Sequence, residues 1–121
     1  MRTLPGKVLS FQVGDTSVDV DEAGYLFDPS DWTPEFALLI AAREEIDLSE
    51  DHWKVLDFMR GYLEEHGIAA DARFAINFLG QLHDLTKKPA KDLLFELFPK
   101  GYVKQACKIS GMRQPRAWST G

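Results

Sequence analysis

The stretch Leu97–Gly111, with the sequence LFPKGYVKQACKISG, determines how this chain is organised and holds its single cysteine. Pro99 and Gly101 end the preceding helix and turn the chain. The residues from Val103 to Ser110 then follow a helical period, and Gly111 suits the position just after a helix. The pattern predicts a short helix that carries the thiol of Cys107, followed by a basic, aromatic tail.

The neighbours of Cys107 predict a thiol that is usable but not strongly activated. Lys104 and Lys108 favour the thiolate, which is the nucleophilic form of cysteine. The end of the helix opposes them, because its dipole disfavours an anion by roughly 0.3–1 kcal/mol. A buried structural role is the alternative, since cysteine is among the most buried residue types. The spacing alone leaves both interpretations open.

Basic residues are concentrated in the last third of the chain. Residues 1–86 contain six Lys and Arg and seventeen Asp and Glu, a net charge of −11, whereas residues 87–121 carry +6. The basic end is suited to an acidic partner, and Arg and Trp are favoured at interface hot spots. The alternatives are a solvated basic helix that docks on the chain's own acidic part and a frayed terminus. The candidate partner-binding residues are Lys100, Lys104, Lys108, Arg113, Arg116 and Trp118.

Length and composition indicate one globular domain over residues 1–121, with 1–7 as a loose leader and 112–121 as a flexible C-terminal arm. The chain is 45% hydrophobic and 27% charged, an ordinary globular balance. A single cysteine fits a reducing compartment, and we see neither a signal peptide nor an apolar run long enough to span a membrane. We therefore expect a cytoplasmic protein with no membrane contact.

The periodicity predicts an α+β fold that is mainly α: a compact orthogonal bundle of about five helices with an N-terminal β-hairpin. Alternating residues from Leu9 to Val20 predict the hairpin. Helical patterns and capping residues predict the helices. The expected features are a first helix capped by Asp31 or Thr33 and ending near Glu45, a second from Ser49 to His66–Gly67, a third capped by Asp71, a fourth opened by Pro89 and a last one over Val103–Ser110.

The sequence contains no recognisable metal or cofactor motif. His52, His66 and His83 are too far apart for a metal pattern, and we expect each to lie at the surface or at a helix end. We find no glycine-rich phosphate loop, no Ser-His-Asp set and no paired catalytic carboxylates. Cys107 is thus the one nucleophile candidate, and we expect no cofactor and no metal.

The segment from Leu97 to Pro115 resembles the C-terminal signature of the DsrC/TusE family of small sulfur-carrier proteins. The likeness continues upstream through Asp21–Leu26, Trp32, Leu48–Trp53 and Phe58–Arg60. It implies a helical fold containing a helix-turn-helix-like pair, and a persulfide carrier that hands sulfur from protein to protein in sulfur metabolism or tRNA thiolation. The implied partners are sulfurtransferases of the TusBCD/DsrEFH type and siroheme sulfite reductase of the DsrAB type.

The sequence departs from the family pattern in its C-terminal arm. DsrC-type carriers have two cysteines near the C-terminus, and Cys107 matches the inner one. The arm after Pro115 has no cysteine, and Trp118 falls roughly where the family has one. An intramolecular disulfide is therefore impossible, and Cys107 is the only possible sulfur-bearing residue.

Three functions remain open at this stage. The first is a sulfur relay through Cys107, in which the protein is at most a sulfurtransferase-type carrier. The second is a docking or regulatory module that keeps the family surface and carries no sulfur. The third is a DNA-binding regulator that uses the helix-turn-helix-like pair, which the acidic part of the chain makes less favourable, so we expect no nucleic-acid partner.

Overall fold

The computed structural model describes residues 8–114, so the predicted leader and most of the predicted arm lie outside the described residues. Within this range the prediction of a mainly α fold with an N-terminal hairpin is confirmed. The elements are β1 (Leu9–Val13), β2 (Thr16–Val20), a 3-10 turn η1 (Pro29–Asp31), α1 (Pro34–Arg43), α2 (Glu50–His66), α3 (Ala72–His83), α4 (Lys87–Leu97) and a π-helical turn η2 (Tyr102–Cys107).

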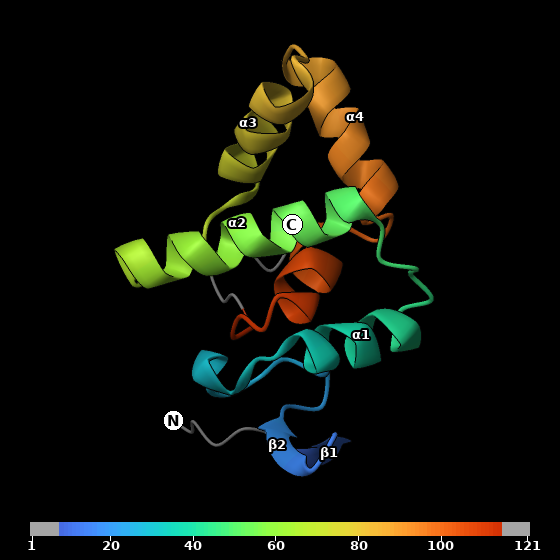
Figure 1. The fold of residues 1–121 in the computed structure, drawn as a ribbon, viewed down its shortest axis with the longest axis vertical. Helices are drawn as coiled ribbons and strands as arrows, with labels where there is room; N and C mark the ends of the chain where they lie inside the picture. The colour runs from blue at the N-terminus through green and yellow to red at the C-terminus, as the bar shows by residue number, and fades with distance from the viewer. Residues whose placement is uncertain (1–7, 115–121) are drawn as a thin grey trace.

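The C-terminal segment that carries η2 lies at the centre of the molecule (Figure 1). The hairpin and α1 lie on one side of it and α2 on the other, while α3 and α4 form a V with α2 running across its open end. Hydrogen bonds confirm the central position, because Glu44 at the end of α1 and Arg60 of α2 both bond to this segment. The stretch Leu97–Gly111 is therefore the central element around which the other helices and the hairpin pack.

The predicted hairpin is present with a two-residue turn. The strands β1 and β2 are antiparallel, and Val13 pairs with Thr16 across Gly14 and Asp15. Gly14 has a φ of +59°, a conformation that glycine adopts without steric cost. Val13, Val18 and Val20 are buried, so the apolar face of the hairpin packs against the core as its alternation predicts.

The predicted helix starts are largely correct. Thr33 rather than Asp31 caps α1, since its hydroxyl accepts a hydrogen bond from the backbone N–H of Phe36. Ser49 caps α2, which ends at Gly67 in the left-handed conformation. Asp71 caps α3 by accepting from the N–H of Arg73. These side chains bond N–H groups that have no partner within the helix itself.

Three boundaries differ from the sequence prediction. Helix α1 ends at Arg43 instead of Glu45, because Glu45 takes a φ of +62° and leaves the helix. Helix α4 begins at Lys87, two residues before Pro89, which is allowed because a first-turn residue has no helical N–H bond to lose. The last helix begins at Tyr102 and winds as a π-helix up to Cys107 before a short α-helical end.

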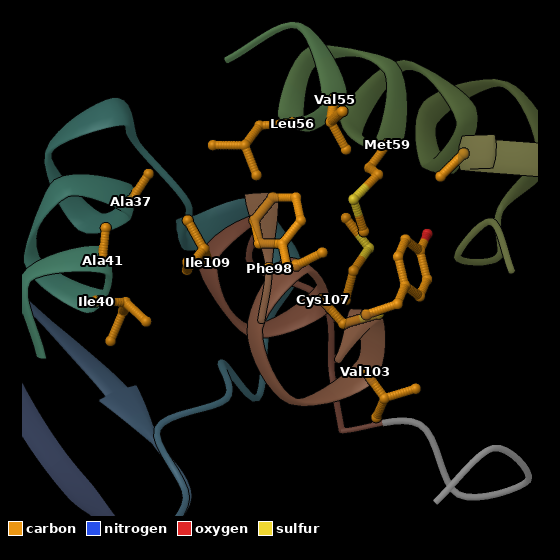
Figure 2. Close-up of a cluster of buried hydrophobic side chains, with 14 of the residues drawn as sticks. Ala37, Ile40, Ala41, Val55, Leu56, Met59, Phe98, Val103, Cys107 and Ile109 are labelled. Atoms are coloured by element: carbon orange, nitrogen blue, oxygen red, sulfur yellow. The ribbon is translucent and has the colours of Figure 1, made fainter. Parts of the chain in front are cut away.

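The core is one cluster to which the hairpin and the helices α1 to α4 contribute together with the C-terminal segment. Figure 2 shows Ala37 and Ile40 of α1 on one side, with Leu56 and Met59 of α2 on the other. Cys107 lies within this cluster. Among the described residues, no helix combines the length and the apolar character needed to cross a membrane.

Candidate functional site

Cys107 lies at the C-terminal end of its helix, where the chain turns back on itself. The N–H of Met112 donates to the carbonyl of Cys107 at 2.9 Å, and the N–H of Gly111 donates to the carbonyl of Lys108 at 3.1 Å. Gly111 has a φ of +80°. This pair of bonds around a left-handed glycine is a Schellman motif, as the position of Gly111 in the sequence suggests. The motif places Cys107 and Met112 at its two hydrophobic positions.

The thiol of Cys107 is completely buried, with 0% of the residue exposed. Burial raises the pKa of the Cys107 thiol to about 12, because the surrounding side chains cannot solvate a thiolate. The prediction of a usable thiol is therefore wrong for this conformation. Its error was to weigh the two sequence neighbours, Lys104 and Lys108, against the helix dipole and to leave burial out.

The three lysines near Cys107 do not form a cationic environment for it. Lys100 and Lys104 are exposed. Lys108 is largely buried, and its ammonium donates to the carboxylate of Glu44 at 3.0 Å. Partial burial raises the pKa of Glu44, but the hydrogen bonds from Lys108 and Gln105 outweigh it and the pKa is lowered overall. The basic helix thus docks on an acidic residue of the same chain, one of the alternatives that the charge distribution suggests.

Glu44, at the end of α1, bonds to both Gln105 and Lys108, which lie on opposite sides of Cys107 in the sequence. Its second oxygen accepts from Nε2 of Gln105 at 3.2 Å, and Gln105 also accepts from the backbone N–H of Lys100 at 2.9 Å. A pocket of about 350 Å³ adjoins this site, lined by Ala23, Gly24, Ile40, Arg43, Glu44 and Lys108. We name the Glu44, Gln105 and Lys108 side chains the clamp. It holds the helix of Cys107 in place.

Trp32 and Arg60 hold the other end of the segment. Nε1 of Trp32 donates to the carbonyl of Ile109 at 2.9 Å, and Nη1 of Arg60 donates to the carbonyl of Ser110 at 3.1 Å. The guanidinium also lies 4.8 Å from the centre of the Trp32 ring. A cation bonded to the last carbonyls of a helix stabilises its C-terminus. The site therefore favours a fixed helix end over an accessible thiol.

Tyr25 and Tyr102 fix the start of η2. The hydroxyl of Tyr25 donates to the carbonyl of Val103 at 2.9 Å, and that of Tyr102 donates to the carbonyl of Ala70 at 2.6 Å. Burial is the largest cause that raises the pKa of Tyr25, to about 12, and the pKa of Tyr102 is raised further for the same reason. Both hydroxyls therefore stay protonated and act as hydrogen-bond donors.

The remaining predicted partner-binding residues are only partly described. Arg113 is exposed, and its Nε donates to the carbonyl of Phe27 at 2.9 Å. Arg116 and Trp118 lie outside the described residues. The structure therefore anchors Arg113 to the loop before α1 but brings no two of the exposed cations Lys100, Lys104 and Arg113 into a common site.

His52 lies at a helix end, as the sequence predicts. It belongs to the capping box at the start of α2 and is buried there. Its Nδ1 accepts from the N–H of Ser49 at 2.9 Å, so Nε2 carries the proton and donates to the carbonyl of Leu97 at 2.7 Å. In residues 8–114, no three His, Cys, Asp or Glu side chains gather as a metal site would require.

Sequence reasoning missed the importance of Glu44 and Gln105. Glu44 lies far from Cys107 in the chain and Gln105 lies on a face that looks polar, so no periodicity points to them. The sequence did point to Trp32 and Arg60, because both belong to segments that resemble the DsrC/TusE family. Their contacts with the segment around Cys107 give that resemblance a structural basis.

Comparison with known proteins decides the family. A family model for DsrC-like proteins matches residues 12–117. The chain belongs to the DsrC-like family. It is 39% identical over 98 residues to the sulfurtransferase TusE of Photorhabdus laumondii, which covers 81% of this chain and 87% of that protein. The TusE of Buchnera aphidicola from Acyrthosiphon pisum is also 39% identical, over 82% of this chain and 86% of its own length.

Solved structures of DsrC proteins share the fold. The DsrC of Allochromatium vinosum superposes with a TM-score of 0.78 at 34% identity, covering 91% of this chain and 97% of that one. The oxidized gamma-subunit of dissimilatory sulfite reductase from Archaeoglobus fulgidus superposes with a TM-score of 0.76 at 29% identity, covering 89% and 97%. The fold and the family expected from the sequence are both confirmed.

Proposed function

We propose that this DsrC-like protein is a sulfur-relay protein that passes sulfur by direct contact with other proteins, and that Cys107 is its sulfur-bearing residue. The observation that carries the proposal is that the segment Leu97–Pro115 resembles the family's C-terminal signature and holds the only thiol of the chain. Relatives 39% identical to it are named sulfurtransferases, which favours a sulfur relay over the docking and DNA-binding alternatives.

The transfer itself is a thiol exchange that requires no external oxidant. The Cys107 thiolate attacks the outer, sulfane sulfur of a donor persulfide. A new S–S bond forms on Cys107, the S–S bond of the donor breaks, and the donor leaves as a thiolate that takes up a proton. The same exchange in reverse passes the sulfur to an acceptor thiol.

Exposure of Cys107 must precede this exchange. With a pKa of about 12, only on the order of 10⁻⁵ of the buried thiol is ionised at pH 7. A donor persulfide must also reach Cys107, of which 0% is exposed. The C-terminal segment therefore has to detach from Glu44, Trp32 and Arg60 when a partner binds, and that opening is part of the proposed function.

Intact-protein mass spectrometry tests the proposal. We expect incubation with glutathione persulfide to add one sulfur to the wild-type chain, slowly when it is alone and faster with a partner sulfurtransferase. A reductant should remove it, and Cys107→Ser should not acquire it. No adduct under either condition, with Cys107 also unreactive to iodoacetamide in the folded protein, would eliminate the carrier role.

The complete burial of Cys107 favours a second candidate function. In it the protein is a docking or regulatory module that occupies the family's binding surfaces without carrying sulfur. The two functions differ in one measurement: Cys107→Ser should abolish sulfur transfer in the relay but leave partner binding and regulation unchanged in the docking module.

The specific partners are also a proposal. The implied partners are a TusBCD/DsrEFH-type sulfurtransferase and a DsrAB-type siroheme sulfite reductase, with assembly in the cytoplasm. Solved neighbours described as the gamma-subunit of dissimilatory sulfite reductase and as dissimilatory sulfite reductase I support the second partner. Co-elution of this chain with each purified complex in size-exclusion chromatography tests them. Comigration with neither would contradict the proposed partners.

A further inference from the structure

A cleft of about 350 Å³ lies between α3 and α4, toward the open end of the V that they form in Figure 1. Ile76 of α3 and Leu94 and Phe95 of α4 line its sides. Tyr102 and Val103 of η2 complete the lining. The cleft is therefore built from three elements that are separated in the sequence, and none of its residues belongs to the clamp or contains the thiol.

The lining of the cleft is apolar and partly open to solvent. Phe95 is 47% exposed, although a large aromatic side chain gains free energy by burial. The volume lies at the lower end of the roughly 300–1,000 Å³ found for ligand pockets. That size accommodates one or two large side chains of a partner rather than a cofactor.

The rim of the cleft is basic. Arg73 and Lys91 belong to its lining, and Lys87 lies one helical turn before Lys91 on α4. The one carboxylate in the lining, Asp71, is already paired with Arg73 at 3.1 Å. Among residues 8–114, Lys87 and Lys91 take part in none of the ion pairs. The cleft thus combines an apolar floor with one lining cation that has no carboxylate partner among these residues, Lys91, and Lys87 lines a neighbouring hollow together with Lys91.

We propose that this cleft binds an acidic, amphipathic segment of a partner protein. One or two large apolar side chains of the segment pack between Ile76 and Phe95, and its carboxylates pair with Lys87 and Lys91. Grooves that take the apolar face of a peptide commonly work in this way. The chain's own C-terminal arm is a poorer occupant, because Arg113 and Arg116 have the same charge as the rim.

The proposal does not depend on sulfur chemistry, since it concerns a surface separate from the thiol. The two are nevertheless connected through η2. A bound segment contacts Tyr102 and Val103, which lie in the same π-helical turn as Cys107. Failure of the carrier role would leave the cleft's binding unchanged, and failure of cleft binding would leave sulfur loading on Cys107 unchanged.

Peptide selection tests the proposal. A phage-displayed random dodecapeptide library is selected on the immobilised full chain, and enriched peptides are synthesised and measured by fluorescence anisotropy. We expect enriched peptides to carry a net negative charge and at least one aromatic or large aliphatic residue. Phe95→Ser and Lys91→Glu should each weaken their binding by at least about tenfold, and added salt should weaken it further.

Two matched variants control the test. Phe74→Ser removes an aromatic residue that is 39% exposed on α3 but outside the cleft, and Lys54→Glu reverses a charge on α2. Both should leave peptide binding unchanged, and thermal unfolding verifies that all four variants are folded. The proposal is overturned if the enriched peptides are neutral or basic, or if Phe95→Ser and Lys91→Glu leave their affinity unchanged. Enrichment of sequences that match this chain itself, or no enrichment, would also overturn it.

Discussion

Gly111 is a residue at which the fold leaves no room for a side chain. Its φ is +80°, and a Cβ placed there would lie 2.5 Å from Cδ1 of Trp32. The indole cannot move away freely, because its Nε1 donates to the carbonyl of Ile109. The backbone conformation and the close approach of Trp32 therefore require glycine at the same position.

Replacing Gly111 by Ala should lower the free energy of unfolding by about 2–4 kcal/mol, the sum of left-handed strain and overpacking. Urea unfolding followed by far-UV circular dichroism measures the change. Gly61→Ala is the matched control, because Gly61 is an exposed helical position where a Cβ would have no neighbouring atom within 4 Å. That control should be neutral or slightly stabilising, and equal effects of the two substitutions would refute the role of Trp32.

The buried thiol should make stability depend on alkaline pH. The pKa of Cys107 is about 12 when folded and about 9.0 at its ordinary value, so the unfolded chain loses this proton first. The contribution of this raised pKa to the free energy of unfolding is fully present below pH 9 and is lost as the pH rises toward 12. Relative to Cys107→Ala, the wild type should lose up to about 1.4 kcal/mol per pH unit above pH 9. Urea unfolding of both proteins from pH 7.5 to 10 checks this, and parallel curves would contradict it.

At the scale of elements, the clamp attaches the helix of Cys107 to the end of α1. Glu44 belongs to the end of α1, while Gln105 and Lys108 come from the segment that carries the thiol. The Lys108 and Glu44 side chains are only 13% and 18% exposed, so their ion pair is screened less than a surface pair. Removing one partner of a largely buried pair leaves the other charge uncompensated.

Glu44→Ala should therefore speed the alkylation of Cys107 under native conditions, because it favours detachment of the helix. The rate with iodoacetamide, followed by mass spectrometry, is the measurement. Glu50→Ala is the control: its partner Lys54 lies at 3.3 Å, but the Glu50 side chain is 83% exposed. If both variants alkylate at the wild-type rate, the clamp does not govern access to the thiol.

At the scale of the whole molecule, the described core lies before two of the predicted partner-binding residues. The residues of the core cluster extend from Val13 to Met112. Arg116 and Trp118, two of the predicted partner-binding residues, follow the last described residue, Gln114. The core residues that the structure describes therefore all precede Arg116 and Trp118 in the sequence.

A chain that stops after Gln114 should unfold at the same temperature as the full chain but bind its partner protein more weakly. Differential scanning calorimetry and co-elution with the purified partner measure the two properties. Arg116→Ala with Trp118→Ala in the full chain is the companion variant, and it should reproduce the loss of binding. A lower unfolding temperature for the truncated chain would show that the arm contributes to the fold.

The family, the order of the elements and most of their ends could be predicted from the amino-acid sequence. Those features depend on local patterns: the alternation from Leu9 to Val20, the capping residues Thr33, Ser49 and Asp71, and the left-handed glycine at position 111. Capping bonds and turns form between residues a few positions apart, so a pattern in the chain is enough to identify them.

The burial of the Cys107 thiol could not be predicted from the sequence, because it depends on how distant elements pack. The sequence places Lys104 and Lys108 beside Cys107, but one points to solvent and the other pairs with Glu44, 64 positions away. Cys107 is buried in a cluster in which Met59 of α2 extends toward it (Figure 2). Burial depends on which distant elements pack over a residue, and here its effect on the pKa exceeds that of neighbouring charges, so no local pattern could reveal it.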